Sequence, residues 1–156
     1  MARLGGGERI PLIYYRSPAT TEYNCIAWAA GEIARWWWPD GMNEYYWPAG
    51  APREETLAAF IAAYSSLGYA PCANADLEEG HEKVALYVGP AGGPTHAARQ
   101  LASGLWTSKL GCMEDVEHDS TGEISALGAN PIYHYGEVGA ILRRRAAETT
   151  APPPTE

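Results

Sequence analysis

The sequence is short of basic residues and of long uncharged apolar runs. It holds 11 lysines and arginines against 19 aspartates and glutamates, which gives the 156-residue chain a formal net charge of −8. That charge repels phosphate backbones and anionic lipid headgroups, so we expect no nucleic-acid partner and no membrane partner. Glu32 and Arg35 interrupt the most apolar stretch, residues 26–38, well before the roughly 18 apolar residues of a transmembrane helix.

Cysteine is also scarce. The three cysteines lie at positions 25, 72 and 112, an odd number at wide spacing, which is typical neither of a disulfide framework nor of a paired-cysteine metal site. The N-terminal sequence MARLGGGERIPL lacks the apolar core of a secretory signal, and this predicts a cytoplasmic protein. No residue pattern indicates a bound cofactor, and none indicates an oligomeric state.

The length and the 46% hydrophobic content fit one compact domain. Residues 1–9 are Gly-rich and polar, and residues 146–156 are small, acidic and Pro-rich, so we expect a flexible N-terminus and a disordered tail. Residues 10–145 then form the domain. Helical periodicity before residue 80 and strand-like alternation after it predict an α+β fold, with N-terminal helices packed on an antiparallel sheet.

Two helices are predicted in the first half of the chain. The first begins at Thr21 to Asn24, whose side chains suit an N-cap, and continues over residues 25–37. The second begins near Pro52, carries apolar side chains at helical spacing and ends at Gly68. Between them, residues 36–47 are rich in tryptophan and tyrosine. We call this segment the aromatic loop and expect it to be ordered.

Four strands are predicted in the second half. EKVALYV, THAARQL and LWTSKLG are short runs separated by Gly-containing turns, which is typical of an antiparallel meander. YGEVGAILRR alternates in hydrophobicity and predicts a closing strand.

A cysteine in the first turn of a helix has a physical route to becoming a nucleophile. Cys25 is predicted to face unpaired backbone N–H groups and the positive end of the helix dipole, both of which favour a thiolate. A thiol nucleophile also needs a proton shuttle, and His96, early in the second predicted strand, is the best placed of the four histidines. The alternative is that Cys25 is a small buried apolar side chain.

The other cysteines and histidines form weaker patterns. Cys72 and Cys112 lie away from any predicted helix start, so we interpret both as structural or incidental. His81 and His118 lie among acidic residues, which is typical of solvated rings, and we expect His134 to pack between its two tyrosine neighbours. A metal site made of Cys112, His118 and His134 matches no ligand spacing, so we expect none there.

The segments YNCIAWAAGE and THAARQL carry a family resemblance. A cysteine on an N-terminal helix, followed by an antiparallel strand that opens with histidine, resembles the papain-like cysteine peptidases and amidases, in particular the minimal bacterial branch that includes the CHAP-type amidohydrolases. Together with WTSKLG, the same segments also resemble an uncharacterised bacterial family. The resemblance covers residues 20–145. It implies a papain-like fold with Cys25 as nucleophile and His96 as base.

The papain-like resemblance also implies a third residue that orients the imidazole. Here the strand after the histidine strand offers Thr107, Ser108 and Lys109, and none of these is an acid or an amide. We therefore expect a carboxylate from the next segment, Glu117 in preference to Asp115. The alternative for both acids is an exposed position in solvent.

Three further residues are candidates for contacts around the nucleophile. Asn24 directly precedes Cys25, and it either caps the helix or helps to stabilise an oxyanion, with capping favoured. Trp28 and Ser108 are assigned to the oxyanion or substrate-binding part of the site.

Two functions are consistent with these residues. The first is a thiol-dependent hydrolase or acyltransferase that acts on an amide or thioester bond of a peptide-like or small-molecule substrate through the Cys25–His96 dyad. Hydrolysis, transfer and deamidation all use that dyad, so the choice among them stays open. The second is a non-enzymatic papain-like module in which the aromatic loop recognises a protein or a small molecule.

Overall fold

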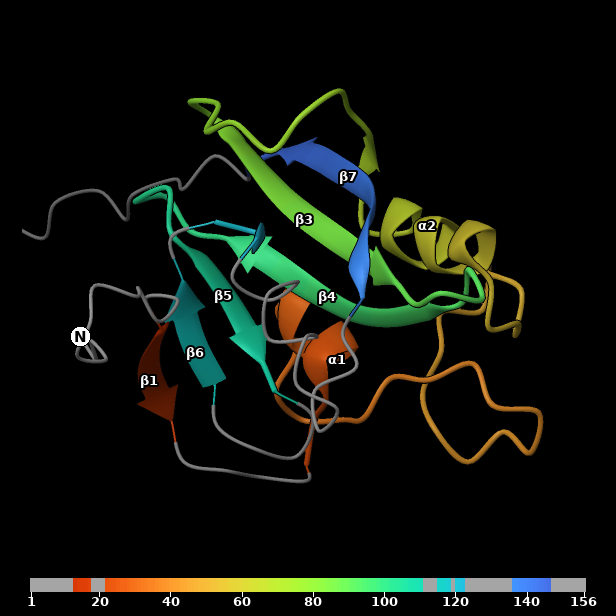
Figure 1. The fold of residues 1–156 in the computed structure, drawn as a ribbon. Helices are drawn as coiled ribbons and strands as arrows, with labels where there is room; N and C mark the ends of the chain where they lie inside the picture. Colours follow the sequence, from red (N-terminus) through yellow and green to blue (C-terminus); the bar gives the residue numbers. More distant parts are fainter. Residues whose placement is uncertain (1–12, 18–21, 111–114, 119, 123–135, 147–156) are drawn as a thin grey trace, which may run out of the picture.

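The computed structural model describes residues 13–17, 22–110, 115–118, 120–122 and 136–146. Within these ranges the chain forms one seven-stranded sheet and two α-helices, which confirms the predicted α+β class (Figure 1). The helices are α1 (Cys25–Ala29) and α2 (Leu57–Ser65). The strands are β1 (Ile13–Ser17), β2 (Ala70–Pro71), β3 (His81–Val88), β4 (Pro94–Gln100), β5 (Trp106–Lys109), β6 (Asp115–His118) and β7 (Glu137–Arg145).

The strands lie in the order β1-β6-β5-β4-β3-β7-β2, and every neighbouring pair is antiparallel. Strands β3, β4 and β5 are the predicted meander, and β7 is the predicted closing strand, which pairs with β3. The prediction missed β1, β2 and β6, which are short strands at the two sides of the sheet. Short strands carry few residues of alternating hydrophobicity, so their sequence signal is weak.

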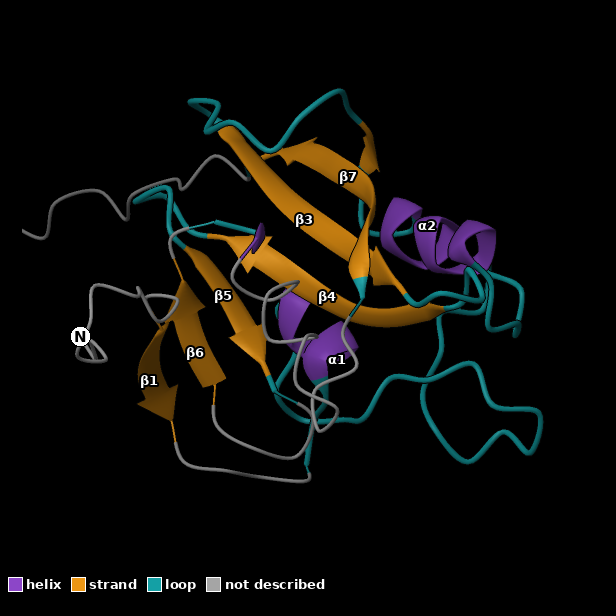
Figure 2. Ribbon diagram, viewed as in Figure 1, coloured by secondary structure: helices purple, strands orange, loops and turns teal. Residues whose placement is uncertain are grey.

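Both helices cover the same face of the sheet, which we call the helix face (Figure 2). The core of this face joins α1 and α2 to the central strands, and it includes Ile26, Phe60, Tyr64, Val84, Leu86 and Leu142. A second apolar cluster lies on the other side of the sheet, which we call the opposite face, and it includes Ala85, Tyr87, Ala98, Trp106 and Leu110. The central strands are therefore buried on both faces.

Helix α1 ends at Ala29, so the predicted helix over residues 25–37 is too long. Gly31 has a φ of +86°, and its N–H bonds the carbonyl of Trp28 while the N–H of Glu32 bonds the carbonyl of Ala27. These two bonds form a Schellman motif, which closes a helix by satisfying its last carbonyl groups. The chain then turns away from the helix axis and continues into the aromatic loop.

Helix α2 is confirmed, but it begins later than predicted. Thr56 is its N-cap and accepts a hydrogen bond from the N–H of Ala59 at 3.2 Å. The chain just before Thr56 is tied to the aromatic loop, because the guanidinium of Arg53 bonds Asp40 and the carbonyl of Tyr45. The hydroxyl of Tyr64 donates to the carbonyl of Ile26 at 2.7 Å and so ties α2 to α1.

Within the described ranges no helix has the length and hydrophobicity needed to cross a bilayer. The predicted flexible N-terminus and all of the predicted tail except Ala146 lie outside the described residues.

Candidate functional site

The thiol of Cys25 lies at the first residue of α1, as predicted, but it is a neutral group in an apolar environment. Cys25 is buried in the core of the helix face. Burial raises the pKa of its thiol to about 11, against a smaller lowering by nearby backbone N–H groups, of which that of Ala97 contributes most. The dipole of a five-residue helix does not overcome this desolvation. The thiol is therefore protonated at neutral pH.

Asn24 is the N-cap of α1, which confirms the favoured prediction for this residue. Its Oδ1 accepts hydrogen bonds from the N–H of Ala27 and the N–H of Trp37, each at 3.1 Å, and its Nδ2 donates to the carbonyl of Trp37 at 2.6 Å. Both ends of the amide are thus used by the backbone of the chain itself. Asn24 fixes the start of the helix and the start of the aromatic loop together.

The side chain of His96 lies on the opposite face of the sheet from Cys25. His96 pairs with Tyr87 in the β3–β4 register, and their rings pack edge to face with centroids 5.2 Å apart. Tyr87 belongs to the core of the opposite face, whereas Ala97, the next residue along β4, belongs to the core that contains Cys25. Successive side chains of a strand point to opposite faces. The sheet therefore lies between the thiol and the imidazole.

The structure does not assemble the predicted Cys25–His96 dyad. Among the described residues no hydrogen bond joins the Cys25 Sγ to either ring nitrogen of His96. Burial, with a smaller effect from the nearby His118, lowers the pKa of His96 to about 3, so the ring is neutral at physiological pH. A protonated thiol and a neutral imidazole on two faces of a sheet do not form the ion pair that thiol catalysis requires.

The predicted third residue is on the wrong face for its assigned role. Glu117 pairs with Thr107 in the β5–β6 register, and the hydroxyl of Thr107 accepts a hydrogen bond from the indole N–H of Trp28 in α1. Paired residues of an antiparallel sheet share a face, so Glu117 lies on the helix side and His96 on the other. The backbone of Asp115 pairs with that of Lys109, and its side chain lies outside the described residues.

The side chain of Trp28 is held by packing and hydrogen-bond contacts and does not line an open site. Its indole N–H bonds Thr107 at 3.0 Å, its ring stacks on Tyr23 with centroids 5.6 Å apart, and the guanidinium of Arg99 lies over its face. These contacts join α1 to β4 and β5. They leave Trp28 as a packing residue of the helix face.

Ser108 contacts His118, and both side chains are fully buried on the opposite face. The prediction that His118 is a solvated ring is wrong. Strand β6 pairs with β5, and this pairing directs the His118 ring toward the buried opposite face of the sheet. Its Nδ1 lies 2.7 Å from the carbonyl of Ser120, which only accepts, so Nδ1 donates there. In the neutral ring Nε2 then accepts from the Ser108 hydroxyl at 2.8 Å.

The Ser108–His118 pair has the spacing of a hydroxyl activated by a base, with the carbonyl of Ser120 orienting the ring. The sequence did not reveal this pair, because His118 lies in an acidic segment, which is a pattern typical of the protein surface. Full burial of both side chains keeps a substrate from the hydroxyl in this conformation. We assign the pair a structural role, since buried polar side chains are stable only when hydrogen-bonded.

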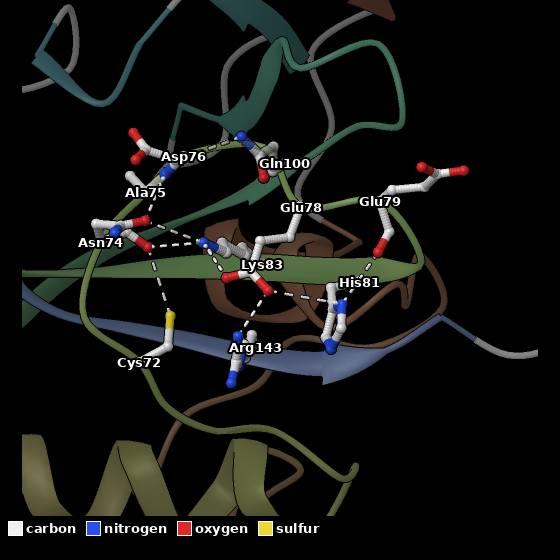
Figure 3. A network of polar contacts seen from close by, with 10 residues as sticks. All are labelled: Cys72, Asn74, Ala75, Asp76, Glu78, Glu79, His81, Lys83, Gln100 and Arg143. Atoms are coloured by element: carbon white, nitrogen blue, oxygen red, sulfur yellow. Dashed lines mark hydrogen bonds and ion pairs between the residues drawn. The ribbon is translucent and has the colours of Figure 1, made fainter.

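A polar network lies on the opposite face of the sheet, where Lys83 of β3 contacts the segment that joins β2 to β3 (Figure 3). The buried ammonium group of Lys83 donates to the carbonyl of Asn74 at 2.9 Å and lies 3.0 Å from the Glu78 carboxylate. Glu78 also bonds Arg143, and these cations hold its pKa below the ordinary value, with the hydrogen bond from Lys83 contributing most.

A cavity of about 590 Å³ adjoins this network, lined in part by Leu77, Glu78, His81, Gln100 and Leu101. The predicted solvated position of His81 is corrected to a half-buried one, with Nδ1 close to the carbonyl of Glu79 and to Glu78. The thiol of Cys72 is half-buried and lies 3.5 Å from the carbonyl of Asn74. The carboxylate of Glu78 is already paired with protein cations, so we interpret the network as a clamp for the 72–82 segment.

No group of three or more potential metal ligands occurs within the described ranges. Cys112 and His134 lie outside the described residues, as does the metal combination considered for them.

The aromatic loop is held in place by side-chain hydrogen bonds to its backbone. Asp40 accepts from the N–H of Glu44 at 2.8 Å and from the N–H of Tyr45 at 3.2 Å, and the first of these bonds contributes most to lowering the pKa of its carboxyl. Arg53 bonds both Asp40 and the carbonyl of Tyr45. Trp37 forms a parallel bridge with Tyr46 across the loop. The predicted order of the loop is confirmed.

Some aromatic side chains of the loop are core and others reach solvent. Trp37 and Trp47 are buried, and the ring of Trp47 packs on Phe60 of α2 with centroids 4.9 Å apart. Tyr45 is 43% exposed, and its ring lies 6.2 Å from that of the half-buried Trp36. The buried tryptophans anchor the loop to the domain, and the ring of Tyr45 stays exposed.

The sequence model of the family described as "Domain of unknown function (DUF7689)" matches residues 14–143, so the chain belongs to that family. The match spans almost all of the described sheet and both helices. Neither the curated proteins nor the solved structures include a significant match to the chain.

Proposed function

We propose that this protein is a binding module, built on a papain-like order of helix and antiparallel strands, in which the aromatic loop recognises a protein segment. One observation carries the proposal. Of the four large apolar side chains that are strongly exposed in the described residues, Met42 and Tyr45 lie in the loop and Ile33 lies just before it. Leu77 is the fourth.

The loop is pre-organised for binding. Asn24, Asp40 and Arg53 fix its backbone through hydrogen bonds, so little conformational entropy remains to be lost when a partner binds. In Figure 1 the chain between α1 and α2 extends well outside the sheet, so a partner reaches it without displacing either helix. Aromatic residues and methionine, both exposed in this loop, are residue types enriched in the buried centre of protein interfaces.

The environment of Cys25 supports binding over thiol catalysis. The thiol is buried and protonated, and the sheet separates it from His96. A hydrolase or acyltransferase that uses this dyad needs the imidazole on the helix face, which requires β4 to reverse the facing of its side chains. Such a reversal shifts the register of β4 with its neighbours and removes Ala97 from the core that holds α1, so the binding function is the simpler one.

The experiment is a selection of a random short-peptide library, displayed on phage, against the full chain. Enriched peptides are then synthesised, and their affinity is measured by fluorescence anisotropy for the natural protein and for Met42→Ser and Tyr45→Ser. We expect each substitution to weaken binding about tenfold, the effect of losing roughly 1.4 kcal/mol at an interface.

Leu77→Ser is the matched control, because Leu77 is 53% exposed but lies outside the aromatic loop. Its affinity for the same peptides should equal that of the natural protein. Equal affinities for all four proteins, an equal loss at Leu77, or a failure to enrich any peptide each contradicts the proposal.

A further inference from the structure

We infer that the partner segment is cationic, with lysine or arginine side chains flanking a large apolar side chain that packs on Met42 and Tyr45. The inference rests on the proposed function and adds the chemistry of the partner. It comes from the charges that surround the apolar surface and from how few of them are neutralised within the protein.

The segment from residue 32 to residue 55 has an excess of carboxylates. It holds five acidic residues and two arginines, which gives it a net charge of −3. Each arginine is already paired, Arg35 with Glu32 at 2.6 Å and Arg53 with Asp40 at 3.0 Å. The two guanidinium groups are therefore not available to the three remaining acids.

The three remaining carboxylates belong to Glu44, Glu54 and Glu55, all of which are exposed. In the part of the chain that the structure describes, none of them forms an ion pair. Glu44 directly precedes Tyr45 in sequence. Glu54 directly follows Arg53, whose guanidinium bonds the carbonyl of Tyr45 in the aromatic loop.

The segment thus combines exposed apolar side chains with carboxylates that no ion pair compensates in the described residues. A rim of one charge sign steers partners of the opposite sign and repels partners of its own. The net charge of −8 on the whole chain acts in the same direction and disfavours phosphate-bearing partners such as nucleic acids and anionic membranes. A cationic and apolar protein segment satisfies both parts of the surface at once.

The side chains at the centre also fit an extended peptide. The rings of Tyr45 and Trp36 form a tilted pair, which offers a rigid wall for an aliphatic or aromatic side chain. Met42 is 80% exposed and has an unbranched thioether, which adapts its shape to the side chain that it meets. Lysine and arginine add apolar stems that cover the edges of such a surface while their charged ends reach the carboxylates.

The test uses the synthetic peptides selected on the natural protein and compares two double variants. Glu44→Gln/Glu54→Gln removes two charges beside the loop, and Asp76→Asn/Glu79→Gln removes two exposed charges from the 72–82 segment. We expect the enriched peptides to carry lysine or arginine beside large apolar residues. We also expect the first variant to weaken binding about tenfold and the second to leave it unchanged.

Salt provides an independent readout. Raising the ionic strength from about 0.1 M to about 1 M shortens the Debye length from about 10 Å to about 3 Å. The affinity of the natural protein for the peptides should therefore fall. The affinity of Glu44→Gln/Glu54→Gln should change much less.

The outcomes separate the two proposals. If Met42→Ser and Tyr45→Ser weaken binding but the charge variants and salt have no effect, the loop is the binding site and the cationic partner is wrong. Enrichment of acidic or uncharged peptides leads to the same conclusion. If the loop substitutions have no effect, the proposed function fails first.

Discussion

The side-chain amide of Asn24 bonds both polar groups of the Trp37 backbone, which lies 13 residues further along the chain. A third bond, from the N–H of Ala27, makes the same amide the N-cap of α1. One buried side chain thus positions the start of the helix and the start of the aromatic loop. We expect Asn24→Ala to lower the free energy of unfolding by about 2 to 4 kcal/mol, since it removes a cap and leaves buried backbone groups unbonded.

Urea unfolding monitored by tryptophan fluorescence measures this loss. Asn24→Ser is the informative control, because serine keeps the capping oxygen but does not reach both groups of Trp37. Its stability should fall between the other two proteins. A loss within experimental error for Asn24→Ala would show that the amide does not hold the loop.

Cys25 should be the slow cysteine of the native protein. Its pKa of about 11 lies two units above the ordinary value of 9.0, so its thiolate population is about 100-fold smaller, and burial further limits access. We expect iodoacetamide at neutral pH to alkylate the half-buried Cys72 well before Cys25, as followed by peptide mass spectrometry in a Cys112→Ser background. Both should react readily after unfolding in guanidinium chloride. Faster labelling of Cys25 at pH 6 would instead indicate a stabilised thiolate and favour the enzyme.

His96 should make the fold sensitive to acid. The imidazole is neutral in the fold, with a pKa of about 3, whereas the ordinary value is 6.5. The unfolded chain therefore binds a proton more readily, so the stability that His96 contributes is present above pH 6.5 and is lost as the pH falls from 6.5 towards 3. Between pH 7 and pH 5 the loss is about 2 kcal/mol.

Comparison of the natural protein with His96→Gln isolates this effect from the titration of carboxylates. Chemical denaturation at both pH values should show a fall in stability that is about 2 kcal/mol smaller for the variant. Identical falls in the two proteins would show that His96 is not desolvated in the fold.

Gly136 should not tolerate a side chain. Its φ is +77°, in the left-handed region that favours glycine, and a Cβ at this position would overlap the backbone of Val88. We expect Gly136→Ala to cost about 3 kcal/mol or more, through strain at the point where β7 begins beside β3. Gly41→Ala is the control, because nothing lies within 4 Å of its Cβ position and its change should stay within about 0.5 kcal/mol. Thermal unfolding of both variants tests the difference.

Local signals in the sequence were sufficient for the central elements. Short runs separated by Gly-containing turns predicted β3, β4 and β5, and the asparagine before Cys25 predicted the cap of α1. These features depend on contacts within a few residues. The end of α1 also had a local signal in Gly31, but the run of apolar residues after it imitates a longer helix.

The sequence by itself determined that Cys25 begins a helix and that His96 lies in a strand, because capping residues and Gly-containing turns act over short distances. Only the tertiary structure decided that the two side chains face opposite sides of the sheet. Within β4, His96, Ala97 and Ala98 are all fully buried, since apolar clusters cover both faces. A strand buried on both faces carries no hydrophobic difference between its odd and even positions, so its sequence does not indicate which side chains meet the helix. That orientation is set by the packing of α1 against Ala97 and by the register with β3, which involve residues far apart in the chain.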